Sequence, residues 1–352
     1  MTKNTSLGYV PALDGLRGIA VILVMLTHAN FQLADNGILG VDIFFALSGF
    51  LITTLLLEEY SLTNSVSLPA FYVRRSFRLF PALYILLLVI VLYKEFLPDS
   101  FGNGSVRLEV LSSALYLNNI SWAWGWKSDV GLLGHSWSLA VEEQFYLLWP
   151  VILIFFLRSD KLNVLIYLLL FLIPGIMYLK YAGLVSDIAN SLLHESIFIG
   201  CFAAMIRNKI NFRIPYADLI TIGLLLFILV IGIAPIRLYM SIYESGLRSL
   251  FAIVSVIIIF GLINGESHYS NKFLSIPILR FTGKISYALY LWHVPVFKWF
   301  KWHSTLEDYQ SFILKFAITI IIACLSWIAI EKRLLRHGHA LSKLITPVPG
   351  TS

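Results

Sequence analysis

The stretch Arg17-Gly-Ile-Ala-Val-Ile-Leu-Val-Met-Leu-Thr-His28 decides the fold, because it sets ten uncharged, mostly apolar residues between an arginine and a histidine. On an α-helix eleven residues make about three turns, so both side chains fall on one face, separated by about 16 Å of rise. A guanidinium and an imidazole cost free energy in hydrocarbon and usually face the interior of a helical bundle. The stretch therefore predicts a membrane-spanning helix with chemistry on its inner face.

The composition of the whole chain is that of an all-α polytopic membrane protein. Of its 352 residues 58% are hydrophobic and 13% are charged, whereas soluble domains average about 25% charged residues. The apolar residues form continuous runs of about twenty rather than the alternating segments of a β-barrel. We expect a multi-pass protein of the inner or plasma membrane, in contact with the lipid bilayer.

Several other classes of protein are disfavoured. The net charge of +6 lies mostly in short loops, where membrane topology explains it, so no nucleic-acid partner is predicted. Cys201 and Cys324 both lie in apolar segments, and no pair of His or Cys residues has zinc-ligand spacing, so neither a disulfide nor a metal is expected. The first apolar segment contains Arg17 and His28 and lacks a clean cleavage site, which favours a retained helix over a signal peptide.

Hydropathy predicts about ten transmembrane helices in a domain of residues 1–335, followed by a short basic cytoplasmic tail, 336–352. The predicted spans are 13–31, 38–57, 79–97, 138–157, 162–180, 190–206, 217–234, 246–264, 283–302 and 311–331. The segment 107–122 is too short and too polar for a span, and we expect it at the membrane interface or as a re-entrant piece.

Loop charges predict that both termini are cytoplasmic. Fifteen Lys and Arg residues follow the even-numbered spans, and Lys3 and Arg17 raise that number to seventeen, whereas the odd-numbered connections hold nine. Cytoplasmic loops carry the excess of positive charge. This orientation puts Arg17 near the cytoplasmic face and His28 at or beyond mid-membrane.

His28 is the first candidate catalytic residue. Histidine is the side chain whose ordinary pKa lies nearest neutrality, so a neutral imidazole here can take a proton from an attacking hydroxyl as a general base. It could equally accept an acyl group itself. The alternative is a purely structural histidine hydrogen-bonded between helices; Arg17 on the same face and Asp14 just before favour function.

Three arginines, Arg74, Arg75 and Arg78, cluster where the third span begins. Residues three and four apart share a helix face. A positive-inside anchor would explain the cluster. Guanidinium forks also bind phosphates well, so a cytosolic donor with a pyrophosphate and a ribose phosphate, such as coenzyme A, would dock here.

Further candidates lie in the outer half of the predicted membrane. Glu143 and Asp42 are acids in apolar helices, where they could orient the imidazole or bind substrate hydroxyls, or form interhelical salt bridges. Trp137 suits an outer aromatic belt but could also stack on a sugar. His293 lies near mid-membrane with a structural or a catalytic role, and Pro295 is expected to kink its helix and free a carbonyl.

Together these stretches resemble the acyltransferase-3 family of integral-membrane acyltransferases, which includes bacterial O-antigen and exopolysaccharide O-acetyltransferases. The resemblance covers most of the chain from residue 9 to about 335. Its five motifs are Leu13-Asp-Gly-Leu-Arg17 with His28, Gly40-Val-Asp-Ile-Phe-Phe-Ala-Leu-Ser-Gly-Phe50, Phe71-Tyr-Val-Arg-Arg-Ser-Phe-Arg78, Trp137-Ser-Leu-Ala-Val-Glu-Glu-Gln-Phe-Tyr146 and Ser286-Tyr-Ala-Leu-Tyr-Leu-Trp-His293.

The resemblance implies transfer of an acyl group, usually acetyl from acetyl-CoA, to a sugar hydroxyl. It implies that Arg17 and His28 are the essential pair, with Arg75 and Arg78 in support. Many family members carry a C-terminal extracytoplasmic hydrolase-like domain that these 352 residues do not include. Whether a separate extracytoplasmic transferase partner completes the reaction therefore stays open.

Our hypothesis is a membrane O-acetyltransferase that moves an acyl group from cytosolic acetyl-CoA to a cell-surface or lipid-linked glycan. A different class is a proton-coupled secondary transporter that uses the buried His and Glu residues as a relay; the lack of an obvious inverted repeat and the clustered arginines count against it. A third is a non-catalytic partner in glycan export. The acceptor sugar, the acyl group and the oligomeric state are left open by the sequence.

Overall fold

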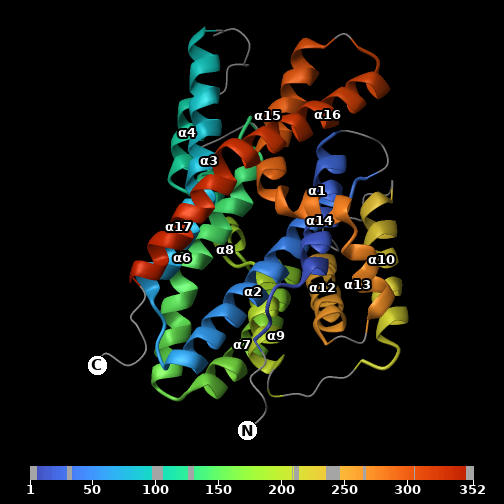
Figure 1. Ribbon diagram of the computed structural model, residues 1–352. Coiled ribbons are helices and arrows are strands. Elements are labelled where there is room, and N and C mark those ends of the chain that lie inside the picture. The colour runs from blue at the N-terminus through green and yellow to red at the C-terminus, as the bar shows by residue number, and fades with distance from the viewer. Residues whose placement is uncertain are drawn as a thin grey trace. The chain divides into compact units, whose positions relative to one another are not determined.

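A computed structural model describes residues 6–29, 34–96, 106–125, 131–207, 209, 214–234, 246–264, 267–304 and 306–345 (Figure 1). Within these ranges the secondary structure is helical and no strand occurs. Contacts divide the chain into two compact units. Unit 1 holds Met1–Ser65 and Leu148–Ser286, and unit 2 holds Val66–Leu147 and Tyr287–Ser352.

Each of the ten apolar segments expected to cross the membrane coincides with a helix. In the part of the chain that the structure describes, six helices are long and apolar enough to span a bilayer, or seven if α12 and α13 together make one broken span. The expected spans outside the six are α9, α10, α12 and α15; the first three have only 13, 17 and 16 residues. At 1.5 Å per residue such helices are shorter than a hydrocarbon core of about 30 Å.

Unit 1 contains the N-terminal helices and most of the middle of the chain. Its elements are α1 (Pro11–His28), η1 (Gly37–Leu39), α2 (Gly40–Thr63), the second half of α6 (Trp137–Arg158), α7 (Leu162–Tyr181), α8 (Asp187–Leu192), α9 (Glu195–Arg207), α10 (Ala217–Ile233), α12 (Arg248–Ile263), α13 (His268–Leu274) and α14 (Pro277–Lys284). Pro11 opens α1 with no amide hydrogen to leave unbonded, and Asp14 in its first turn complements the helix dipole.

Glycines bring α2 into direct backbone contact with its neighbours. A Cβ on Gly49 would overlap the carbonyl oxygen of Ile197 in α9, and one on Gly200 would overlap that of Ala46. At the other end of the helix, a Cβ on Gly40 would overlap the carbonyl oxygen of Ala20 in α1. Small residues allow such close approach between helices, so α2 is fixed against both α9 and α1.

Unit 2 contains the remaining elements. They are α3 (Leu68–Phe96), α4 (Val106–Ala114), α5 (Asn118–Ala123), η3 (Gly134–Ser136), the first half of α6, α15 (Ser286–His303), which starts at the unit boundary, α16 (Asp308–Ser326), the π-helical turn η5 (Trp327–Glu331) and α17 (Lys332–Ile345). Figure 1 shows α17, in red, lying along α3. A Cβ on Gly338 would lie 2.6 Å from the Cβ of Phe77. The expected tail boundary at 335 therefore falls within α17, a helix of fourteen residues that packs on α3.

The polar segment 107–122 forms α4 and α5, and most of its polar side chains, though not Arg107, are buried. Asn118 Nδ2 donates to the carbonyl oxygen of Leu133 at 2.7 Å, and Gln144 Nε2 in α6 donates to the carbonyl oxygen of Tyr116 at 2.9 Å. Asn119 and Gln144 exchange a pair of hydrogen bonds at 3.0 Å. Buried polar groups need such partners, which explains why a segment too polar to span is nevertheless buried.

The close contact between α2 and α9 predicts that replacing a glycine there destabilises the protein, whereas replacing a glycine outside the contact does not. Gly49→Ala should lower the free energy of unfolding by about 1–3 kcal/mol, because the new methyl group meets backbone that cannot rotate away. Gly223→Ala in α10 is the matched control, since nothing lies within 4 Å of its Cβ position; it should be neutral or slightly stabilising. Thermal unfolding of both variants in nanodiscs measures the difference, and equal melting temperatures would contradict the packing.

Candidate active site

His28 is the last residue of α1, and the backbone of its own helix fixes its tautomer. Its Nδ1 lies 2.9 Å from the carbonyl oxygen of Val24. A carbonyl oxygen only accepts hydrogen bonds, so Nδ1 carries the proton of the neutral ring. The Nε2 atom then holds the lone pair, so it is the atom that would accept a proton in general-base catalysis.

Arg17 lies on the same helix, and contacts from distant parts of the chain hold its guanidinium. Its Nη2 donates to Ser286 Oγ at 3.2 Å, and its Cζ lies 5.7 Å from the ring centroid of Phe44 in α2. Arg17, Phe44 and Ser286 come from three of the five sequence motifs, and the fold brings them together. Arg17 is thus a fixed charge rather than a mobile side chain.

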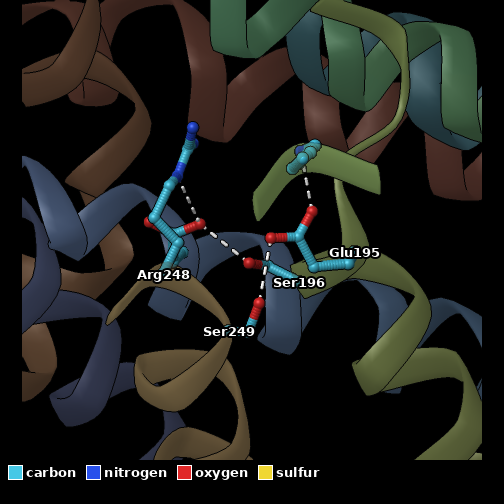
Figure 2. Close-up of polar contacts among 6 residues, drawn as sticks. Glu195, Ser196, Arg248 and Ser249 are labelled. Atoms are coloured by element: carbon cyan, nitrogen blue, oxygen red, sulfur yellow. Dashed lines mark hydrogen bonds and ion pairs between the residues drawn. The ribbon is translucent and has the colours of Figure 1, made fainter. Parts of the chain in front are cut away.

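Asp42, one of the predicted acids, forms part of a buried polar network in unit 1 (Figure 2). Its side chain is 1% exposed and pairs with Arg248, whose Nε lies 3.3 Å from each carboxylate oxygen. Ser196 Oγ donates to Asp42 Oδ1 at 2.8 Å. Asp42 is therefore engaged by α9 and α12, in the manner of the interhelical salt bridge that the sequence left open.

A second ion pair joins the same network. Lys180 Nζ lies 2.8 Å from Glu195 Oε2, with side chains 5% and 3% exposed, and Ser249 Oγ donates to Glu195 Oε1 at 2.9 Å. The consecutive residues Glu195-Ser196 and Arg248-Ser249 thus join the two ion pairs (Figure 2). Ser196 donates to the acid that Arg248 contacts, and Ser249 donates to the acid that Lys180 contacts. The formal charges of these two acids and two cations cancel within the network.

Of this network, only Asp42 is a candidate from the sequence alone. Lys180 and Arg248 are two of the nine Lys and Arg residues that lie in the connections after the odd-numbered predicted spans. The structure places both in ion pairs inside the protein. The only sign of the network in the sequence was that Lys180, Glu195 and Arg248 each lie at the end of an apolar segment.

In unit 2 the predicted residues Arg75 and Glu143 are brought together. The Arg75 guanidinium lies 4.7 Å from the ring centroid of Tyr146 and 5.9 Å from that of Phe71, and it interacts electrostatically with Glu143. Among the described residues, no hydrogen bond reaches the buried Glu143 Oε1. A buried carboxylate oxygen without a donor is costly, so this atom is a candidate contact for a substrate hydroxyl.

The expectation that Pro295 frees a carbonyl is confirmed. Proline has no amide hydrogen for the Leu291 carbonyl four residues earlier, and His135 Nε2 lies 3.2 Å from that oxygen instead. The rings of His135 and His293 pack edge to face with centroids 5.1 Å apart. His293 is 0% exposed, and its Nδ1 lies 2.7 Å from the Tyr290 carbonyl oxygen, so its lone pair is on Nε2.

The predicted site residues therefore fall into two groups. Arg17, His28 and Asp42 belong to unit 1, whereas the other six belong to unit 2. Trp137 begins α6 and is half-buried, and Arg74 and Arg78 lie one turn apart on α3, also half-buried. Among the described residues, no group of three His, Cys, Asp or Glu side chains could hold a metal ion.

Comparisons with known proteins show which family the sequence resembles. A family model described as "Acyltransferase domain" matches residues 10–332. The chain is 33% identical over 96% of its length to the peptidoglycan O-acetyltransferase OatA of Listeria monocytogenes, covering 57% of that protein. It is 33% identical over 96% to a putative O-acetyltransferase of Staphylococcus aureus, covering 59%. It is 32% identical over 94% to the putative peptidoglycan O-acetyltransferase YrhL of Bacillus subtilis, covering 55%.

Two facts bound these similarities. The chain spans a little more than half of the length of the curated relatives it matches. No solved structure matches it.

The buried network predicts a strong coupling between Asp42 and Arg248. Arg248→Gln should lower the free energy of unfolding by about 3–5 kcal/mol, since it leaves a buried carboxylate without its cation. The double variant Asp42→Asn with Arg248→Gln should recover much of that loss. The control pair is Glu58 and Arg207, 3.5 Å apart with side chains 18% and 14% exposed, where a coupling of about 1 kcal/mol or less is expected. Additive effects at Asp42 and Arg248 in a double-mutant cycle would contradict the pairing.

Proposed function

The chain belongs to the acyltransferase-3 family, and from this we propose that it is a membrane O-acetyltransferase that acetylates a hydroxyl of a cell-envelope glycan. The observation that carries the proposal is the match of the family model to residues 10–332. The position of His28 Nδ1, 2.9 Å from the Val24 carbonyl oxygen, supports it, because Nε2 is then the proton-accepting atom of the neutral ring. Two of the relatives are named as peptidoglycan O-acetyltransferases, so peptidoglycan or a lipid-linked precursor is the proposed acceptor class.

His28 is the proposed general base. Its Nε2 accepts the proton of the acceptor hydroxyl as the oxygen bonds to the acyl carbon, and it returns that proton to the departing thiolate as the carbon–sulfur bond breaks. The Nδ1–H bond to the Val24 carbonyl also supports the imidazolium that forms between these steps. A covalent acyl-His28 is the alternative sequence of steps with the same residue.

Acetyl-CoA is the proposed donor, and it supplies an acyl thioester. Arg17 lies about 16 Å along the helix from His28, too far to touch the same acyl carbon, so its role is to bind the body of the donor. Arg74, Arg75 and Arg78 are the proposed phosphate ligands. Arg75 is packed on Tyr146, so we assign the outer contacts to Arg74 and Arg78.

The remaining residues are assigned to the acceptor and to support. Glu143 Oε1, buried and without a hydrogen bond among the described residues, is the proposed acceptor of a sugar hydroxyl. Trp137 and His293 complete the proposed sugar contacts. Asp42 supports α2 through Arg248, which makes it a positioning residue.

The membrane arrangement is part of the proposal. Ten spans with both termini in the cytoplasm would place the arginines of α3 on the donor side. The short helices α9, α10 and α12 are then spans around which the bilayer thins or flanking side chains snorkel to the interface.

The family assignment supports this enzyme over a proton-coupled transporter. The buried acids Asp42 and Glu195 are each matched by a cation, an arrangement that holds protons less readily than the unpaired relay a carrier requires.

His28→Ala should abolish acetyl transfer, because the chain then lacks the base, while the melting temperature changes little. His303→Ala is the matched control: His303 also ends a helix and also places Nδ1 2.9 Å from the carbonyl four residues back, that of Trp299. This variant should keep wild-type turnover. The assay follows acetyl-labelled acetyl-CoA with purified protein in nanodiscs and a membrane-glycan extract, and full transfer by His28→Ala would refute the mechanism.

A further inference from the structure

The last helix of the structure, α17, carries a continuous cationic stripe. Lys332, Arg336, His339 and Lys343 are spaced four, three and four residues apart, which places them on one face over about 16 Å of helix. All four side chains are exposed. The sequence Lys332–Ile345 contains no acidic residue, so no carboxylate of the same helix compensates this face.

The face of α17 that packs on α3 lies next to the stripe, about 100° around the helix. Gly338 and Ser342 are buried, and Gly338 lies against Phe77. Phe77 stands between Arg74 and Arg78 in α3. Glu331, the residue before α17, interacts electrostatically with Arg78. The stripe therefore flanks the contact between α17 and α3, in the same unit as Arg74 and Arg78.

Such a juxtaposition concentrates like charges, which repel one another along a helix face. An anionic ligand with several phosphates would relieve that repulsion and gain charge-assisted hydrogen bonds from the guanidinium groups. Anionic lipid headgroups also attract a basic helix face, but a second arginine cluster in the same unit favours one ligand with several phosphates.

We propose that the α17 stripe binds the 3′-phosphate at the nucleotide end of coenzyme A, beside the diphosphate held by Arg74 and Arg78. This inference rests on the proposed function and adds α17 as the element that distinguishes coenzyme A from donors without the 3′-phosphate. Arg336, in the middle of the stripe, is the proposed direct contact of this phosphate, and the other three cations add to the positive field around it.

The test compares the binding of coenzyme A and of 3′-dephospho-coenzyme A to the full chain in nanodiscs of neutral lipid, by calorimetry. The wild-type chain should bind coenzyme A at least about tenfold more tightly. Arg336→Gln should remove about tenfold of that preference while the Kd for the dephospho form stays within about twofold. Arg333→Gln is the matched control, with the same exposed position on α17 and the same charge change but off the stripe, and it should keep the preference.

Several outcomes would overturn the inference. One is a wild-type chain that binds both ligands equally, and another is an equal loss in Arg336→Gln and Arg333→Gln, which would indicate a diffuse field. If the stripe binds anionic lipid headgroups instead, the preference is absent in neutral nanodiscs and Arg336→Gln alters only the melting temperature in anionic ones. Equal turnover of acetyl-CoA and acetyl-dephospho-CoA would refute the stripe and leave the transferase standing, whereas no turnover of either would refute the proposed function itself.

Discussion

The cost of burying charge in an apolar helical protein is the constraint on which the structure of unit 1 depends. Asp42 and Glu195 are 1% and 2% exposed, and a carboxylate in such a place is tolerable only with a cation and a hydroxyl beside it. Arg248 with Ser196, and Lys180 with Ser249, provide these partners. The network thereby joins α2, α7, α9 and α12. The close approach of Gly40 to Ala20 in turn holds α2 against α1.

Backbone carbonyls, rather than carboxylates, set the protonation of the key imidazoles. The Val24 carbonyl orients His28, and the Tyr290 carbonyl orients His293. Pro295 releases the Leu291 carbonyl, which His135 then satisfies. A carbonyl carries no formal charge, so it fixes a tautomer without the desolvation cost of a second buried ion. This is an economical way to hold a base ready within hydrocarbon.

Much of the outline could be predicted because it depends on local pattern. Each expected span is a helix, and the freed carbonyl at Leu291 follows from proline chemistry alone. The network around Glu195 could not be predicted from the sequence. Lys180 and Arg248 lie at the ends of apolar segments, where a charged side chain is expected to be exposed to water, but both form buried ion pairs. The inward polar face of α4 and α5 was missed for a similar reason: its partners are Leu133, Ser136 and Gln144, on other elements.

The sequence by itself determined the helical class, the membrane setting, the family and the shared face of Arg17 and His28, since periodicity, hydropathy and motif order are properties of the chain read in line. Only the tertiary structure decided which charge neutralises which, that Arg17 meets Ser286 from 269 residues away, and that α17 runs beside the α3 arginines. Those outcomes depend on helix packing. Packing depends on how small residues at distant positions let backbones meet, which no single segment specifies.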